Sequence, residues 1–113
     1  MTAFSLTMNA FAGDAQIKAQ LLGYWKSPRH PYLIQADGLM RMCPTTGPYA
    51  ATVVNRWDVR NGVFYMNIPN AGMETYKIVT LNKRQFVIQG ISGSETGDVF
   101  NFYRTTRADA ESQ

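Results

Sequence analysis

Turns that contain glycine or proline divide this chain into short apolar segments, and their spacing restricts the fold more than any other feature. Within most segments apolar and polar residues alternate, which is typical of β-strands with one buried face. A new segment begins about every ten residues, and a short turn joins it to the one before. The predicted strands are residues 22–27, 32–36, 39–43, 52–59, 63–68, 73–81, 85–91 and 99–105.

The turn residues favour pairing between strands that follow one another in the chain. Asp37-Gly38 and Asn61-Gly62 are typical of the two-residue turn between antiparallel strands, because residues in that turn adopt positive φ. Eight such strands closed on themselves leave no exposed sheet edge. We therefore predict an all-β fold, an eight-stranded antiparallel up-and-down barrel. The alternative is a Greek-key sandwich, which needs longer connections than most of these.

A short helix is predicted before the first strand. Asp14 is a suitable N-cap for residues 15–22, in which Ile17 and Leu21 recur at helical spacing. A helix of about two turns is unstable alone, so its apolar stripe must pack on the barrel. Residues 13–106 would then form one barrel domain, and the polar residues 107–113 are predicted to be a disordered tail.

The first twelve residues are uncharged and end in Ala10-Phe11-Ala12, the pattern of small residues that precedes a signal-peptidase site. We interpret residues 1–12 as the remnant of an export signal, which predicts a periplasmic or secreted bacterial protein. A disordered tail on a cytoplasmic protein is the alternative, because no basic residue precedes the apolar part. No segment approaches the roughly 20 apolar residues of a membrane span.

Chemical groups of the kind that catalyse reactions are scarce in this sequence. Cys43 is the only cysteine and His30 the only histidine, so no disulfide can form within the chain and no metal site can be built from several cysteines or from a pair of histidines. No nucleophile elbow or phosphate-binding loop is present. The net charge of +3 is spread along the chain, without the clustering that nucleic-acid binding needs. We predict a non-enzymatic protein without a cofactor or metal and without a nucleic-acid partner.

Leu22-Gly23-Tyr24-Trp25 resembles the Gly-x-Trp signature on the first strand of lipocalins, and like that signature it follows a short helix. In that family an arginine near the end of the last strand lies over the tryptophan ring, and Phe100-x-Phe102-x-Arg104 supplies such an arginine. The resemblance implies that Gly23, Trp25 and Arg104 form a structural kernel at a closed barrel end. The short loops, the lack of a Thr-Asp-Tyr motif and the lack of a disulfide are more similar to compact bacterial lipocalin-like domains of unknown function.

Alternation also predicts which side chains face the barrel interior. If Trp25 and Arg104 face inward, their alternate neighbours Phe100 and Phe102 do so too, and on other strands the more apolar face is chosen. A barrel of eight strands is about the size at which side chains either fill the lumen or leave room for one small ligand. The candidate ligand-binding residues of the lumen are Tyr32, Ile34, Met40, Met42, Trp57, Phe64, Met66, Tyr76, Phe100 and Phe102.

Two functional hypotheses follow from this interior. The first is a lipocalin-like binding protein that holds a small apolar ligand in the lumen. The second is a barrel packed solid by its own side chains that acts as an interaction module, an assembly factor or inhibitor, with a protein partner in the cell envelope. Its rigid proline-containing loops, residues 27–31, 44–49 and 69–72, would then contact the partner at low entropic cost.

Overall fold

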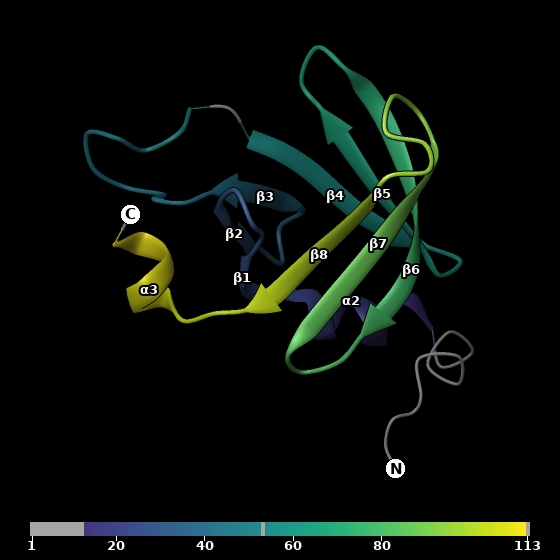
Figure 1. The fold of residues 1–113 in the computed structure, drawn as a ribbon, viewed down its shortest axis with the longest axis horizontal. Coiled ribbons are helices and arrows are strands. Elements are labelled where there is room, and N and C mark those ends of the chain that lie inside the picture. Colours follow the sequence, from purple (N-terminus) through teal and green to yellow (C-terminus); the bar gives the residue numbers. More distant parts are fainter. Residues whose placement is uncertain (1–12, 53, 113) are drawn as a thin grey trace.

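The alternating segments close into a cylinder of strands in the computed structural model of the protein, which describes residues 13–52 and 54–112 (Figure 1). The strands of this part follow one another around the barrel in sequence order, and every neighbouring pair is antiparallel. The predicted fold class is therefore confirmed. The strands are β1 (Gly23–Lys26), β2 (Pro31–Ile34), β3 (Leu39–Met42), β4 (Val54–Arg60), β5 (Val63–Ile68), β6 (Gly72–Leu81), β7 (Gln85–Ser92) and β8 (Val99–Arg104).

Closure of the sheet depends on β1, which pairs with β2 on one side and with β8 on the other. In the β1–β8 pairing Trp25 stands opposite Arg104. The pairing of β6 with β7 changes register between Thr75 and Tyr76 and again between Ile78 and Thr80. Such bulges bend and twist a strand, which helps a sheet of short strands to curve into a closed barrel.

Helix α2 (Asp14–Leu21) packs across one end of the barrel (Figure 1). It buries Ile17 and Leu21, which are 1% and 0% exposed and belong to the main hydrophobic core. Its polar side is joined to β4, because Nζ of Lys18 lies 2.9 Å from Oδ1 of Asp58. The apolar stripe predicted for this helix therefore does pack on the barrel, as a helix this short requires.

The predicted role of Asp14 as N-cap is wrong. Gly13 is the N-cap, no side chain caps the helix, and Asp14 is the first helical residue. The Asp14 carboxylate instead accepts hydrogen bonds from the backbone N–H groups of Asn61 and Gly62, at 2.7 and 2.9 Å. The Asp14 carboxylate therefore binds N–H groups of the β4–β5 turn and not those at the start of its own helix. This contact fixes the start of α2 to the barrel.

The prediction of a disordered tail after residue 106 is also wrong. Helix α3 (Arg107–Glu111) forms there, and the Thr106 side chain caps it by accepting a hydrogen bond from Asp109 N–H at 3.1 Å. Ala110 is 1% exposed, which shows that this helix packs on the rest of the chain. Figure 1 shows α3 beside the long β3–β4 loop. A threonine followed three residues later by an acidic residue is a sequence signal for the start of a helix, and the prediction of a tail from the polar composition of residues 107–113 did not use it.

Residues 1–12, which carry the predicted export signal, lie outside the described part of the chain. Among the described residues, neither α2 nor α3 has the length and apolar character of a membrane-crossing helix.

Candidate functional site

The structural kernel predicted at the closed end of the barrel is confirmed in its geometry. The guanidinium carbon of Arg104 lies 3.9 Å from the centroid of the Trp25 ring. Nη1 of Arg104 donates to the Leu22 carbonyl at 2.7 Å and Nη2 to the Gln20 carbonyl at 2.9 Å, while the Trp25 indole N–H donates to the Leu21 carbonyl at 2.8 Å. The end of α2 is thereby joined to β8, and burial lowers the pKa of Arg104.

Gly23 belongs to this kernel because a larger residue at its position would crowd the Arg104 side chain. A Cβ atom there would lie 2.9 Å from Nη1 of Arg104, and the backbone φ of +115° is one that side chains rarely allow. The group that closely approaches this glycine is the Arg104 side chain.

Most of the predicted lumen residues lie together in the core. Trp57, Phe64, Tyr76 and four others of this set are buried, whereas Tyr32 and Phe100 are half-buried and pack against them. Met42 is half-buried and is not part of the core cluster. Their role in ligand binding stays a prediction. The buried members are Ile34, Met40, Trp57, Phe64, Met66, Tyr76 and Phe102.

Aromatic rings occupy the middle of the barrel. The Phe64 centroid lies 5.4 Å from Phe86, 6.0 Å from Tyr76 and 6.3 Å from Trp57. Phe86 continues this contact network to Trp25 at 5.7 Å. These separations are typical of packed aromatic pairs, so several of the side chains predicted to line the lumen contact one another.

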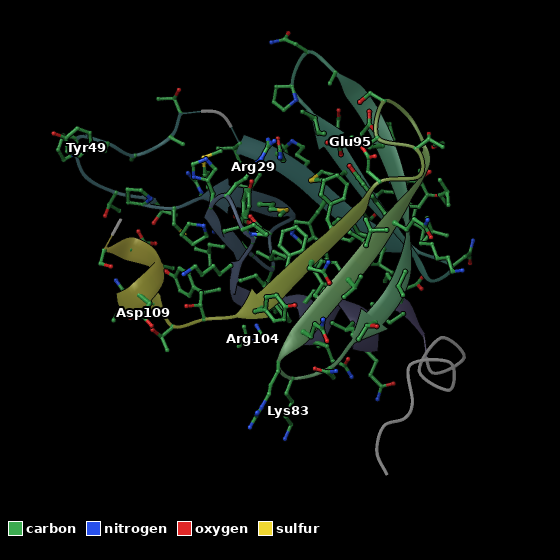
Figure 2. All side chains as sticks on the ribbon, in the orientation of Figure 1. Arg29, Tyr49, Lys83, Glu95, Arg104 and Asp109 are labelled. Carbon is green, nitrogen blue, oxygen red and sulfur yellow. The ribbon has the colours of Figure 1, made fainter. Side chains whose placement is uncertain are left out.

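At the opposite end from α2, the β7–β8 loop folds toward the barrel interior and is held there by Glu74. This carboxylate is 1% exposed and accepts hydrogen bonds at 3.2 Å from the N–H groups of Ser94 and Glu95 and from the Ser94 hydroxyl. Figure 2 shows Glu95 and Arg29 at this end and Arg104 and Lys83 at the other.

The loop places the Glu95 carboxylate on the Tyr76 hydroxyl, which donates a hydrogen bond to it. Burial raises the pKa of Tyr76, and the Glu95 carboxylate raises it further. Glu74 was not among the predicted lumen residues, although it stands two residues before Tyr76 and both are buried. Its charge hid it, because the interior face of each strand was predicted from apolar character.

A cavity of about 320 Å³ lies outside the barrel, between α2 and β4. We call it the α2 cavity. Small side chains leave it open, and Trp57 forms its largest aromatic surface. Its two charged lining residues, Lys18 and Asp58, are paired with each other. The full lining is Ala15, Lys18, Ala19, Leu22, Ala36, Gly38, Trp57 and Asp58.

A second hollow, of about 470 Å³, adjoins the first on the outer face of β4 and β5, and we call it the β4 groove. The two share Ala36, Gly38, Trp57 and Asp58. The β4 groove is more polar than the α2 cavity. Its remaining lining residues are Asp37, Arg56, Arg60, Tyr65, Asn67 and Met73.

Asp58 organises the charges where the two hollows meet. Its carboxylate oxygens lie 2.9 Å from Nζ of Lys18 and 2.9 Å from Nε of Arg60. The hydrogen bond from Lys18 is the main cause that lowers the pKa of Asp58 to about 2, and the Arg60 contact lowers it further against the effect of burial. Arg60 also lies over the Tyr65 ring, with its guanidinium carbon 5.2 Å from the centroid.

A third cluster fixes α3 to the β3–β4 loop. Glu111 accepts hydrogen bonds from the Thr45 N–H and hydroxyl, both at 2.7 Å, and from the Tyr24 hydroxyl at 3.2 Å. Cys43 is buried beside this cluster. Burial and then the nearby Glu111 carboxylate raise the pKa of its thiol to about 11, so the thiol is protonated at neutral pH. This cluster connects elements and exposes no reactive group.

Among the described residues, no three histidine, cysteine or acidic side chains are arranged to hold a metal ion. Comparison with protein-family models, with curated proteins and with solved structures finds no match for this chain.

Proposed function

We propose that this protein is a non-enzymatic binding protein for a small apolar molecule, and that the molecule binds in the α2 cavity against Trp57. The observation that carries the proposal is the cavity of about 320 Å³ between α2 and β4. Small-molecule sites have volumes of roughly 300–1,000 Å³ and mostly apolar linings. The rings that fill the middle of the barrel favour this site over the lumen that the sequence suggested.

The lining of the α2 cavity suits an apolar guest. Ala15, Ala19 and Ala36 are exposed, so their methyl groups can make new contacts with a ligand. Trp57 is only 7% exposed and is held by a hydrogen bond from its indole N–H to the Gln35 carbonyl at 2.9 Å. A fixed aromatic surface loses little conformational freedom when a ligand packs on it.

A titration with N-phenyl-1-naphthylamine, a neutral apolar dye that becomes fluorescent on binding, tests the proposal. We expect saturable binding with energy transfer from tryptophan. The variant Ala19→Leu, which adds a side chain to the wall of the cavity, should weaken binding about tenfold or more, because the added atoms occupy the ligand's place. Ala108→Leu on α3 is the matched control, since Ala108 is exposed and lines neither hollow.

The outcomes separate the two sites within this chain. Binding that Ala19→Leu leaves unchanged would contradict the α2 cavity and favour the open end of the lumen, where Tyr32 and Phe100 are half-buried. The absence of saturable binding would contradict the proposed function itself. Unchanged folding of the variants is checked by circular dichroism and by their melting temperature.

A second candidate function is the interaction module of the cell envelope, with a barrel packed by its own rings. The specific observation in its favour is Tyr49, which is 84% exposed in the β3–β4 loop while Thr45 of the same loop is held by Glu111. Exposed tyrosines are common anchors of protein interfaces. If Tyr49→Ala abolishes recovery of a specific partner from envelope extract and the dye does not bind, this function replaces the first.

Kinship to lipocalins stays a proposal as well. The up-and-down barrel and the Trp25–Arg104 contact support it, and no family match accompanies them. Likewise, the absence of catalytic activity and the export of the protein stay predictions from the sequence.

A further inference from the structure

The α2 cavity and the β4 groove form one continuous surface. Both are lined by Trp57 and Asp58 and by the β2–β3 turn residues Ala36 and Gly38. A molecule whose apolar part packs on Trp57 in the α2 cavity can therefore extend along β4. The next outward side chain that it meets on this strand, two residues before Asp58, is Arg56.

The charges along this surface are unevenly paired. Lys18 and Arg60 both bind the Asp58 carboxylate, and Arg60 also lies over Tyr65. Within the described part of the chain the Arg56 side chain has no hydrogen bond, ion pair or ring contact, although it is exposed in the β4 groove. The remaining acid of the groove, Asp37, accepts a hydrogen bond from the Leu39 N–H at 3.1 Å.

Counting each side chain at neutral pH, Lys18, Arg56 and Arg60 carry positive charge and Asp37 and Asp58 carry negative charge, so one positive charge is left over on the joined surface. Arg56 is the cation without a partner. Asn67, its cross-strand neighbour on β5, also lines the groove and adds a side-chain amide that can donate a hydrogen bond.

From this arrangement we propose that the molecule bound in the α2 cavity is a small organic anion, and that Arg56 binds its anionic group. The inference rests on the proposed function and adds the chemical class of the ligand. A guanidinium offers two parallel N–H groups to a carboxylate, sulfonate or phosphate, which fits an oxyanion better than a neutral polar group. The apolar part of the ligand packs on Trp57, and the anionic group lies in the β4 groove.

Two dyes that share one ring system test the inference. 1-Anilinonaphthalene-8-sulfonate carries a sulfonate, and N-phenyl-1-naphthylamine is the same skeleton without it. We expect the folded protein to bind the sulfonate about five- to tenfold more tightly than the neutral dye, as one charge-assisted contact at a solvated site provides. The variant Arg56→Gln should reduce this preference to about twofold or less while leaving the affinity for the neutral dye unchanged.

Two further variants control for general electrostatic attraction. Arg84→Gln removes an exposed arginine in the β6–β7 turn that lines neither hollow, and it should leave both affinities unchanged. Asp37→Asn removes a negative charge from the β4 groove, and it should strengthen sulfonate binding about twofold. A sulfonate affinity that falls equally in Arg56→Gln and Arg84→Gln would overturn the assignment to Arg56.

Failure of this inference and failure of the proposed function give different results. If both dyes bind with equal affinity and Ala19→Leu weakens both, an apolar site exists and the anionic class is wrong. If neither dye binds saturably, the proposed function is wrong. If the sulfonate binds but Ala19→Leu has no effect on it, the anion binds elsewhere and the inference is overturned.

Discussion

Trp25 and Trp57 each donate the indole N–H to a backbone carbonyl, to Leu21 at 2.8 Å and to Gln35 at 2.9 Å, and both side chains are buried. They differ in what surrounds the remaining ring surface. Arg104 covers Trp25, whereas Trp57 lines two open hollows. The arginines of the two regions differ in the same way, because the Arg104 side chain donates to backbone carbonyls and the Arg56 side chain has no partner among the described residues.

The two regions differ in whether their polar side chains have partners within the protein. At the closed end Nε, Nη1 and Nη2 of Arg104 and the indole N–H of Trp25 all donate to backbone carbonyls, so these groups are satisfied within the protein. Beside Trp57 the Asp58 carboxylate is satisfied by Lys18 and Arg60, and Arg56 is left over. Substitutions at the first region should change stability, and substitutions at the second should change binding.

The largest expected effect is that of Trp25→Ala. Removing a fully buried indole from beneath Arg104 leaves a cavity in the core, and we expect the free energy of unfolding to fall by about 3–5 kcal/mol. Urea denaturation followed by far-ultraviolet circular dichroism measures the change. Trp57→Phe, which keeps a ring and loses one hydrogen bond, should cost about 1 kcal/mol. Equal losses in the two variants would mean that the fold depends on Trp57 as much as on Trp25.

Arg104→Met should have the next largest effect. It removes the hydrogen bonds to Leu22 and Gln20 and the cation over Trp25, and we expect a loss of about 2–3 kcal/mol. Arg56→Met is the matched control on the other side of the comparison and should change stability by no more than about 0.5 kcal/mol. A stability loss at Arg56 close to that at Arg104 would show that Arg56 is structural.

Gly23→Ala tests the closed end through the backbone. The added Cβ would lie 2.9 Å from Nη1 of Arg104 at a φ of +115°, and a cost of about 1–3 kcal/mol is expected. Gly47→Ala has a φ of +90° with no atom within 4 Å, so it reports the cost of positive φ without the contact. Melting temperatures measure both effects, and we expect Gly23→Ala to lower stability more than Gly47→Ala does. Equal decreases would mean that the contact with Arg104 adds no cost.

The smallest expected effect is the pH dependence that Asp58 contributes. Because contacts with Lys18 and Arg60 hold the pKa of Asp58 at about 2 in the folded protein, below its value of about 3.9 in unfolded chains, this group stabilises the fold above about pH 4. The stabilisation is lost as the pH falls toward 2. Solvent screens the partly exposed pair, so the contribution is under about 1 kcal/mol.

Acid denaturation curves of the wild type and of Asp58→Asn check this sign. The stability difference between the two proteins should shrink between about pH 4 and pH 2, and added salt should reduce it at neutral pH. A difference that stays constant over this range would mean that the contacts of Asp58 do not lower its pKa.

The barrel and its closed end could be predicted because both depend on local signals. Alternation assigned Trp25 and Phe102 to the interior, and turns such as Asn61-Gly62 fixed which strands are neighbours. Once the strands close in order, the last strand meets the first, and the register of that pairing places Arg104 opposite Trp25. The contact itself was predicted from the resemblance of Gly23, Trp25 and Arg104 to the lipocalin signature, because strand order alone does not set the register.

The candidate site could not be predicted in the same way. The α2 cavity exists because α2 packs beside β4, and the sequence does not specify where around the barrel end a short helix packs. Trp57 was assigned to the lumen by alternation, but its place beside the β2–β3 turn follows from the hydrogen bond to Gln35. Lys18 and Asp58 are distant in the sequence, and neither segment carries a pattern that predicts their ion pair. This pairing leaves Arg56 without an acidic partner among the described residues.

The closed order of the strands restricts how this protein can recognise other molecules. In the described barrel each strand has a partner on both sides, so no strand presents the whole length of one edge to an extended peptide. Recognition by strand addition, in which a partner lengthens the sheet, is thereby disfavoured. Whatever binds here must recognise side chains and the hollows between them.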